Sequence, residues 1–163
     1  MGVFEQMYLL RRVDVWARNR LNRVVKSAKL QFIDSGLLAT LLELTAQEAQ
    51  HDRTRFGKAL ESFVYGELLK ATTTADGQYS LMYYRDTDKV EVDVVIENAA
   101  GQWVGVEVKA SATVKEADLK GLRKLSRLAG DHFKMGILLY DGDETLPLGD
   151  NIWAAPLATL WGR

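Results

Sequence analysis

Two carboxylates and a lysine stand in two neighbouring stretches of this sequence, where they could hold a metal ion beside a phosphodiester. Asp93 belongs to the first stretch, while Glu107 and Lys109 belong to the second and are separated by a single residue. Carboxylate oxygens are the ligands that Mg²⁺ prefers in proteins, and a metal held in this way can polarise a phosphate ester. The residue types therefore predict a divalent-metal site, provided that the chain brings the two stretches together.

The chain around these residues predicts a β-hairpin that does so. Both stretches alternate, and each is expected to place three apolar side chains on one face (Val92, Val94 and Ile96; Val104, Val106 and Val108). Residues 99–101 form a three-residue loop that ends in a glycine, which suits the left-handed position of such a loop. That loop pairs Asn98 with Gln102, and the same register sets Asp93 opposite Glu107.

Two like charges directly opposite each other destabilise a sheet. Lys109 could partly neutralise them as a surface ion pair, worth only about 0–1 kcal/mol, and a bound cation would offset the repulsion better. The alternative is a solvated surface cluster, and the hairpin by itself leaves both interpretations open.

Length and composition indicate a single domain with a sizeable core. The chain has 163 residues, a net charge of −1 and no cysteine, which excludes disulfides and thiolate metal sites. We expect a basic, partly helical segment over residues 1–45, packed on a core of residues 46–163. No apolar run reaches membrane-spanning length, so we expect no membrane partner, and the cytoplasm is the default location.

The first thirty residues are strongly basic. They hold seven lysines and arginines against two acids, and Arg18, Arg20 and Arg23 are the candidate phosphate contacts. Val13, Trp16 and Ala17 recur at near-helical spacing. A solvated helix face or a basic linker is the alternative to a nucleic-acid contact.

Periodicity and capping residues predict the remaining elements. Asp34 or Ser35 caps one helix, and Thr45 with Glu48 forms a capping box that opens the next segment. The further predicted elements are a strand over 29–33, helices over 37–44 and 54–71, strands over 81–85 and 90–97, a helix through Leu119 to Leu128, a central strand over 133–140 and a final strand over 151–155. This order predicts an α/β (α+β) fold.

The succession of helix, three strands, helix and strand resembles the core of the PD-(D/E)XK nuclease superfamily. Its signature is an acid, a spacer, and then (D/E)-x-K, which Asp93 and Glu107-Val108-Lys109 match. Superfamily members often add an acid from the preceding helix, and Glu61 is in the matching place. The resemblance implies a restriction-endonuclease-like core, with a central mixed β-sheet flanked by helices.

Four blocks of the chain resemble a narrower group, the DUF4143 domain. Residues 26–37 read KSAKLQFIDSGL and resemble its KSPKLYFVDTGL block, with Ala28 and Gln31 as departures. Residues 57–64 resemble its G-x-x-x-E-x-F-V helix, and residues 84–93 resemble its Y-x-R … E-V-D segment. This domain is found at the C-terminus of prokaryotic ATPases of the AAA type, which implies an ATPase domain as partner. This chain has no G-x-x-x-x-G-K-[ST] loop, so it is not expected to bind ATP by that route.

The resemblance also implies roles for the site residues. Asp93 and Glu107 would ligate Mg²⁺ or Mn²⁺, with the main-chain carbonyl of Val108 as a third ligand and Glu61 acting directly or through water. Lys109 would orient the attacking water or stabilise the transition state. Arg85 could hold a phosphate, and its alternative is an exposed arginine at a strand end.

Three functions remain open from the sequence. The first is a metal-dependent nuclease that acts on DNA or RNA. The second is a catalytically inactive nuclease-fold module for nucleic-acid binding or regulation. The third is an interaction domain that docks a partner chain through its basic segment.

Overall fold

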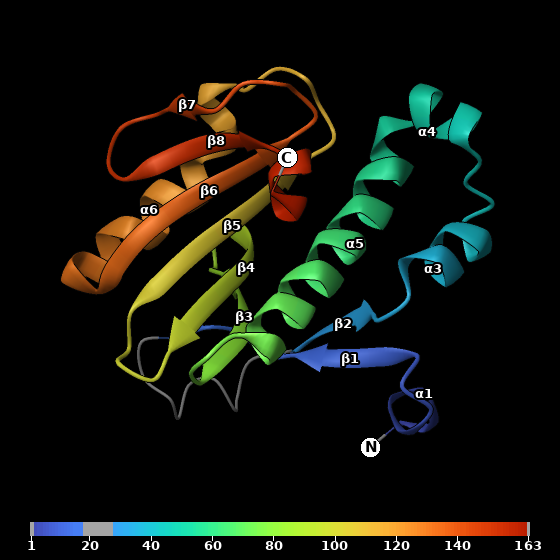
Figure 1. Cartoon of the computed structure of the whole chain (residues 1–163), viewed down its shortest axis with the longest axis horizontal. Coiled ribbons are helices and arrows are strands. Elements are labelled where there is room, and N and C mark those ends of the chain that lie inside the picture. Colours follow the sequence, from blue (N-terminus) through green and yellow to red (C-terminus); the bar gives the residue numbers. More distant parts are fainter. Residues whose placement is uncertain (1, 18–27, 163) are drawn as a thin grey trace.

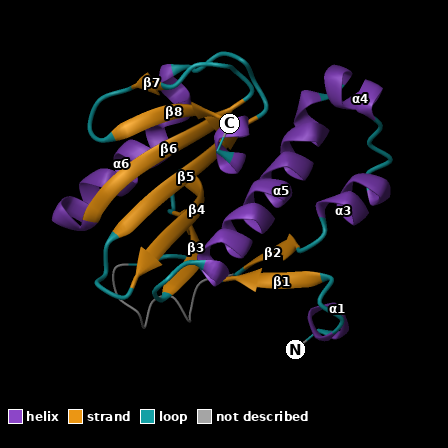
Figure 2. Cartoon of the chain, viewed as in Figure 1, coloured by secondary structure: helices purple, strands orange, loops and turns teal. Residues whose placement is uncertain are grey.

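A six-stranded sheet with helices on both faces forms the body of the molecule, and a separate two-stranded ribbon lies beside it (Figures 1 and 2). The computed structural model describes residues 2–17 and 28–162. Its helices are α1 (Val3–Gln6), α3 (Ser35–Leu41), α4 (Ala46–His51), α5 (Arg53–Thr74) and α6 (Lys120–Ala129). Its strands are β1 (Leu10–Val13), β2 (Lys29–Phe32), β3 (Tyr79–Arg85), β4 (Glu91–Asn98), β5 (Trp103–Lys109), β6 (Phe133–Tyr140), β7 (Leu146–Pro147) and β8 (Ile152–Pro156).

The large sheet is mixed and has the order β3-β4-β5-β6-β8-β7. The meander β3-β4-β5 is antiparallel, β6 is parallel to β5 and to β8, and β7 is antiparallel to β8. The predicted fold class, a mixed sheet flanked by helices, is confirmed. The nearly all-apolar strand β6 lies between two neighbours, as its composition predicts.

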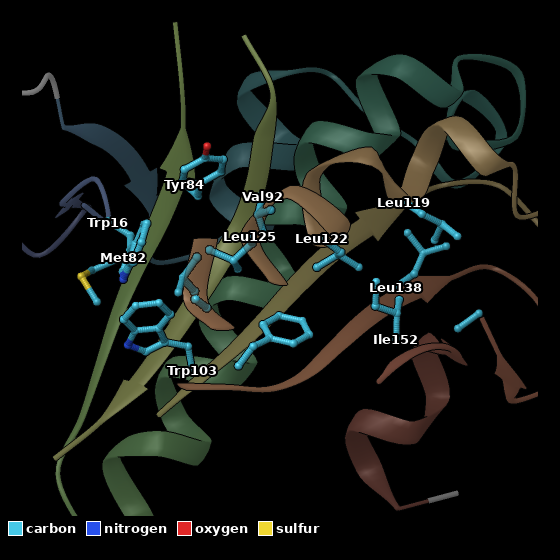
Figure 3. Close-up of a cluster of buried hydrophobic side chains, with 14 of the residues drawn as sticks. Trp16, Met82, Tyr84, Val92, Trp103, Leu119, Leu122, Leu125, Leu138 and Ile152 are labelled. Carbon is cyan, nitrogen blue, oxygen red and sulfur yellow. The ribbon is translucent and has the colours of Figure 1, made fainter. Parts of the chain in front are cut away.

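Helix α6 covers one face of this sheet. Its Leu122 and Leu125 are fully buried and belong to one cluster with Val92 and Val95 of β4 (Figure 3). A Cβ on Gly105 of β5 would lie only 2.8–2.9 Å from these two leucines, so the glycine lets the helix approach the sheet closely.

Helix α5 covers the opposite face. The carboxylate of Asp52 accepts hydrogen bonds from the main-chain N–H groups of Thr54 and Arg55 and so caps the first turn. Leu60 and Val64 of this helix are buried in a second cluster, which includes residues from β4 and β5. The site-bearing strands are therefore held from both sides.

The N-terminal segment is extended where the sequence predicts a helix. Val13 ends β1, and Val15 bridges to Tyr83 at the edge of β3. Trp16 is buried against Trp103 and Tyr84, with ring centroids 4.6 and 5.9 Å apart. The helical prediction for residues 13–17 is therefore wrong. Residues 15 to 17 are all buried in an extended chain, so Val13, Trp16 and Ala17 fit a helical spacing without forming a helix. The remainder of that predicted stretch lies outside the described residues.

The predicted helix caps are confirmed. Asp34 caps α3 by accepting from the N–H of Leu37, and Thr45 and Glu48 form the capping box of α4. Within the described parts of the chain, no helix combines the length and apolar character that crossing a membrane requires.

Candidate metal and phosphodiester site

The β4–β5 hairpin has the predicted turn and register. Asn98 donates its N–H to the carbonyl of Gln102 (3.1 Å), and Gly101 takes a positive φ of 71°. The paired residues run from Glu97 with Trp103 to Val94 with Val106. Continuing this register sets Asp93 across from Glu107.

A β-bulge in β4 changes how Asp93 is presented. Met82 pairs with Val95 and Tyr84 pairs with Val92, so β4 has two residues, Asp93 and Val94, opposite the single Tyr83. The prediction that side chains alternate strictly along β4 is therefore wrong. Val92 and Val95 share the α6 side of the sheet, whereas Val94 packs in the cluster on the α5 side.

Asp93 lies where the hairpin ladder ends. The main-chain N–H of Val108 donates to the carboxylate of Asp93 (2.9 Å), next to Glu107 in sequence. The side chain of Asp93 thus replaces a ladder bond and is fixed by the backbone of the strand that carries the second acid. Such backbone fixation orients a ligand without a dedicated side-chain partner.

Both acids are partly buried and lie close to each other, which favours their protonated forms. Burial, followed by the charge of Glu61, raises the pKa of Asp93 to about 6. Burial, followed by the charge of Asp93, raises the pKa of Glu107 to about 8. The Oε2 atom of Glu107 is buried and has no hydrogen-bond partner among the described residues. An orphaned carboxylate oxygen is what a bound proton or cation would satisfy.

Lys109 supplies the positive charge expected beside these acids. Its ammonium lies 3.2 Å from Glu107 and 3.9 Å from Asp118, which belongs to the 3₁₀ turn Glu116–Leu119 before α6. Burial, the largest single effect, lowers the pKa of Lys109, but the charge and hydrogen bond of Glu107, together with the charges of Asp93 and Asp118, outweigh it and leave the pKa raised. Lys109 is therefore a cation at the site.

A second lysine, Lys29 of β2, also reaches the site. Its ammonium forms an ion pair with Glu61 of α5 and lies 3.6 Å from Glu91. Arg85 lies 3.9 Å from Glu91 on the other side. Sequence reasoning gave Lys29 no role, because its partner Glu61 is far along the chain and no local pattern links the two. Its place in a family-like block was the one available signal.

The predicted residues Glu61, Asp93, Glu107 and Lys109 therefore occupy one region, and Arg85 lies at its margin. Arg18, Arg20 and Arg23 lie outside the described residues. Within residues 2–17 and 28–162, no three acidic or histidine side chains are arranged as a ready metal cage. Mg²⁺ usually keeps several waters and needs only one or two carboxylates. Asp93 and Glu107 meet that requirement, whereas Glu61 faces Lys29.

A groove of mixed charge lies along α6, with Glu116 and Asp150 in its lining as well as cations. This helix carries four cations and no acid, and Lys120, Arg123 and Arg127 line a cavity of about 860 Å³. The 3₁₀ turn that approaches Lys109 through Asp118 also lines this cavity through Glu116. Arg123 pairs with Glu116, and its buried Nε atom has no hydrogen-bond partner among the described residues.

Two family models match this chain. A family model described as a domain of unknown function, DUF4143, matches residues 56–160. This range contains all the acids of the site and Lys109, but not Lys29. The chain belongs to the DUF4143 family. A second model, described as a domain of unknown function, DUF8612, matches residues 1–48, the part that contains β1 and β2.

Two curated proteins are similar in sequence to this chain. One is an uncharacterized protein of Mycobacterium bovis and the other an uncharacterized protein of Mycobacterium tuberculosis. Each is 28% identical over 154 residues, which cover 91% of this chain and 32% of the relative. The chain thus spans about a third of the length of these relatives. No solved structure matches it.

Proposed function

We propose that this DUF4143 chain is a nuclease-like domain that hydrolyses phosphodiesters with the help of Mg²⁺ or Mn²⁺. The observation that carries the proposal is the partly buried pair Asp93 and Glu107, in which one oxygen of Glu107 has no hydrogen-bond partner in the described part of the chain and Lys109 lies beside it. Burying two like charges is costly, and a function in binding a cation explains why the pair is there.

Each residue has a role in this proposal. When bound, the metal would polarise the phosphate and lower the pKa of its own water. Asp93 and Glu107 would hold it, with the carbonyl of Val108 as a further oxygen. Lys109 would stabilise negative charge on the phosphate, and Arg85 would steady a neighbouring phosphate.

The element order supports a restriction-endonuclease-like core. Helix α5 precedes the β3-β4-β5 meander, and α6 and β6 follow it, with the acids on the second and third strands. The relatives are about three times as long as the matched region, which leaves room for the ATPase domain proposed as partner. Cellular DNA or RNA as the substrate would place the activity in the cytoplasm.

A cleavage assay with Mg²⁺ or Mn²⁺ on single- and double-stranded DNA and RNA tests the proposal. Lys109→Ala should lower the rate about 100-fold or more while the fold is retained, because an electrostatic stabiliser is lost. Lys134→Ala, which removes an exposed lysine from β6, is the matched control and should cleave normally. If Lys109→Ala cleaves as fast as the parent, the proposed role of this lysine is wrong.

The second candidate is a nuclease-fold module that binds nucleic acid or a regulatory partner without cleaving. The ion pair between Lys29 and Glu61 favours it, because an ammonium already neutralises one acid of the set. Such a module would keep its nucleic-acid affinity in Asp93→Ala. It would lose affinity when Arg18, Arg20 or Arg23 is neutralised, and as salt is raised.

A further inference from the structure

A side-chain ammonium already lies among the acids of the candidate site. Lys29 contacts Glu61 and Glu91 and acts electrostatically on Asp93. Lys29 and Glu61 are both partly buried, with 28% and 24% of their side-chain surfaces exposed. The ammonium of Lys29 is therefore shielded from solvent more than in an ordinary surface ion pair, so its positive charge acts strongly on the neighbouring acids.

The ribbon β1–β2 positions Lys29 beside the acids. Lys29 and Gln31 are two residues apart on β2 and therefore lie on one face of the strand. Gln31 donates to the hydroxyl of Ser62 (3.0 Å), and both of these residues are buried, which anchors β2 on α5. Lys29 meets Glu61, the neighbour of Ser62, so the anchor places its ammonium at the acids.

Lys29 and the acids lie in regions of the chain that match different family models. Lys29 lies within the stretch that matches DUF8612, whereas Glu61, Asp93 and Glu107 lie within the DUF4143 match. The acid cluster is therefore completed by a residue from outside the domain that carries it.

We infer that Lys29 is a built-in competitor of the divalent cation, and that the β1–β2 ribbon thereby sets the metal affinity of the site. This inference rests on the proposed metal site and assigns its regulation. While Lys29 is in place, Glu61 is held in an ion pair and is not free to ligate. Withdrawing the ammonium removes a repulsive charge and releases a third carboxylate.

Calorimetric titration of Mn²⁺ into the full chain tests the inference. Lys29→Met should bind Mn²⁺ about 10-fold more tightly than the parent, because two like-signed cations no longer share the site. Lys29→Arg keeps the charge and should stay within about two-fold of the parent. Lys70→Met, which breaks the Lys70–Glu67 pair on the outer part of α5, is the matched control and should not change the affinity.

A double variant shows whether Glu61 is the ligand that is released. Lys29→Met with Glu61→Gln should lose most of the gain seen in Lys29→Met alone. If Lys29→Met fails to fold, as judged by circular dichroism, Lys29→Gln replaces it, since the amide can still donate to Glu61.

Two results would overturn the inference, and they are distinguishable. If the parent binds Mn²⁺ and the folded charge-removing variant binds no more tightly, Lys29 is not a competitor, although the metal site stands. If neither protein binds Mn²⁺, the proposed metal site itself fails and the inference fails with it.

Discussion

At the scale of single residues, the site is defined by two acids, Asp93 and Glu107, whose partial burial disfavours their charged forms. Burial and the neighbouring carboxylate raise the pKa of Glu107 to about 8, and that of Asp93 to about 6. The folded protein therefore holds protons that the unfolded chain releases. Where the folded state binds more protons, stability falls as pH rises.

This linkage predicts that the metal-free protein loses stability between pH 6 and pH 8, through the titration of Glu107. Glu107→Gln cannot titrate, so its melting temperature should be nearly constant across that window. One unit of pKa shift corresponds to about 1.4 kcal/mol, so the variant should melt several degrees above the parent at pH 8, at about 2–4 °C per kcal/mol. Thermal unfolding followed by circular dichroism measures both curves.

Glu144→Gln, at an exposed glutamate of the Asp141–Glu144 turn, is the control and should keep the parent's pH dependence. The same slope in Glu107→Gln as in the parent would show that this carboxylate does not titrate in that range.

Local sequence patterns found the site residues that share one hairpin and missed the contacts that join distant elements. Asp93, Glu107 and Lys109 share one hairpin, whose turn and alternation can be read locally. Lys29 meets Glu61 from a separate ribbon, and Asp118 meets Lys109 from the turn before α6. Periodicity carries no information on which distant elements dock together.

At the scale of elements, helix α6 fixes the start of β4 by close contact with it. Gly121 faces the main-chain carbonyl of Glu91, and a Cβ at this position would overlap that oxygen. Because Asp93 lies two residues beyond Glu91, the position of the helix bears directly on the position of the acid.

Gly121→Ala should therefore destabilise the protein by about 2–3 kcal/mol, since overpacking forces backbone shifts. Chemical denaturation monitored by tryptophan fluorescence provides the free energy of unfolding. Gly66→Ala is the matched substitution in α5, where the nearest atom to the new Cβ is the carbonyl oxygen of Ile33 at 3.7 Å. It should be neutral or stabilising by up to about 1 kcal/mol, from helix propensity. Equal effects of the two substitutions would contradict the close α6–β4 contact.

The elements themselves follow well from the sequence, but their irregularities do not. Asp34 and Thr45 cap the first turns of their helices with their side chains, and such capping can be predicted from neighbouring residues. The bulge at Asp93 and Val94 depends on pairing with Tyr83 of another strand. Alternation alone therefore assigned Val92 and Val95 to opposite faces, whereas the structure places them on the same one.

At the scale of the whole molecule, the N-terminal segment is part of the core. Trp16 is 3% exposed and packs against Trp103 of β5 and Tyr84 of β3, as Figure 3 shows. Its near-helical spacing from Val13 suggested a helix, because the tertiary contacts that bury an extended segment are not visible in the sequence.

Trp16→Ala should cost about 3–5 kcal/mol, the usual loss when a large buried aromatic side chain is truncated. Trp153→Ala, at a tryptophan that is 40% exposed on β8, should cost clearly less. Both values come from denaturant unfolding curves. A loss at Trp16 no larger than that at Trp153 would mean that residues 10–17 do not stabilise the sheet.

Calorimetric titration of Mn²⁺ at pH 7 decides whether Asp93 and Glu107 together bind a divalent cation. Titrations in two buffers of different ionisation enthalpy report the protons released. We expect binding that releases close to one proton per metal, because Glu107 must lose its proton to ligate. In Asp93→Asn the binding should vanish, while Asp143→Asn in the exposed turn should bind like the parent. Absence of binding in the parent, or unchanged binding in Asp93→Asn, would show that this pair of carboxylates does not hold the metal.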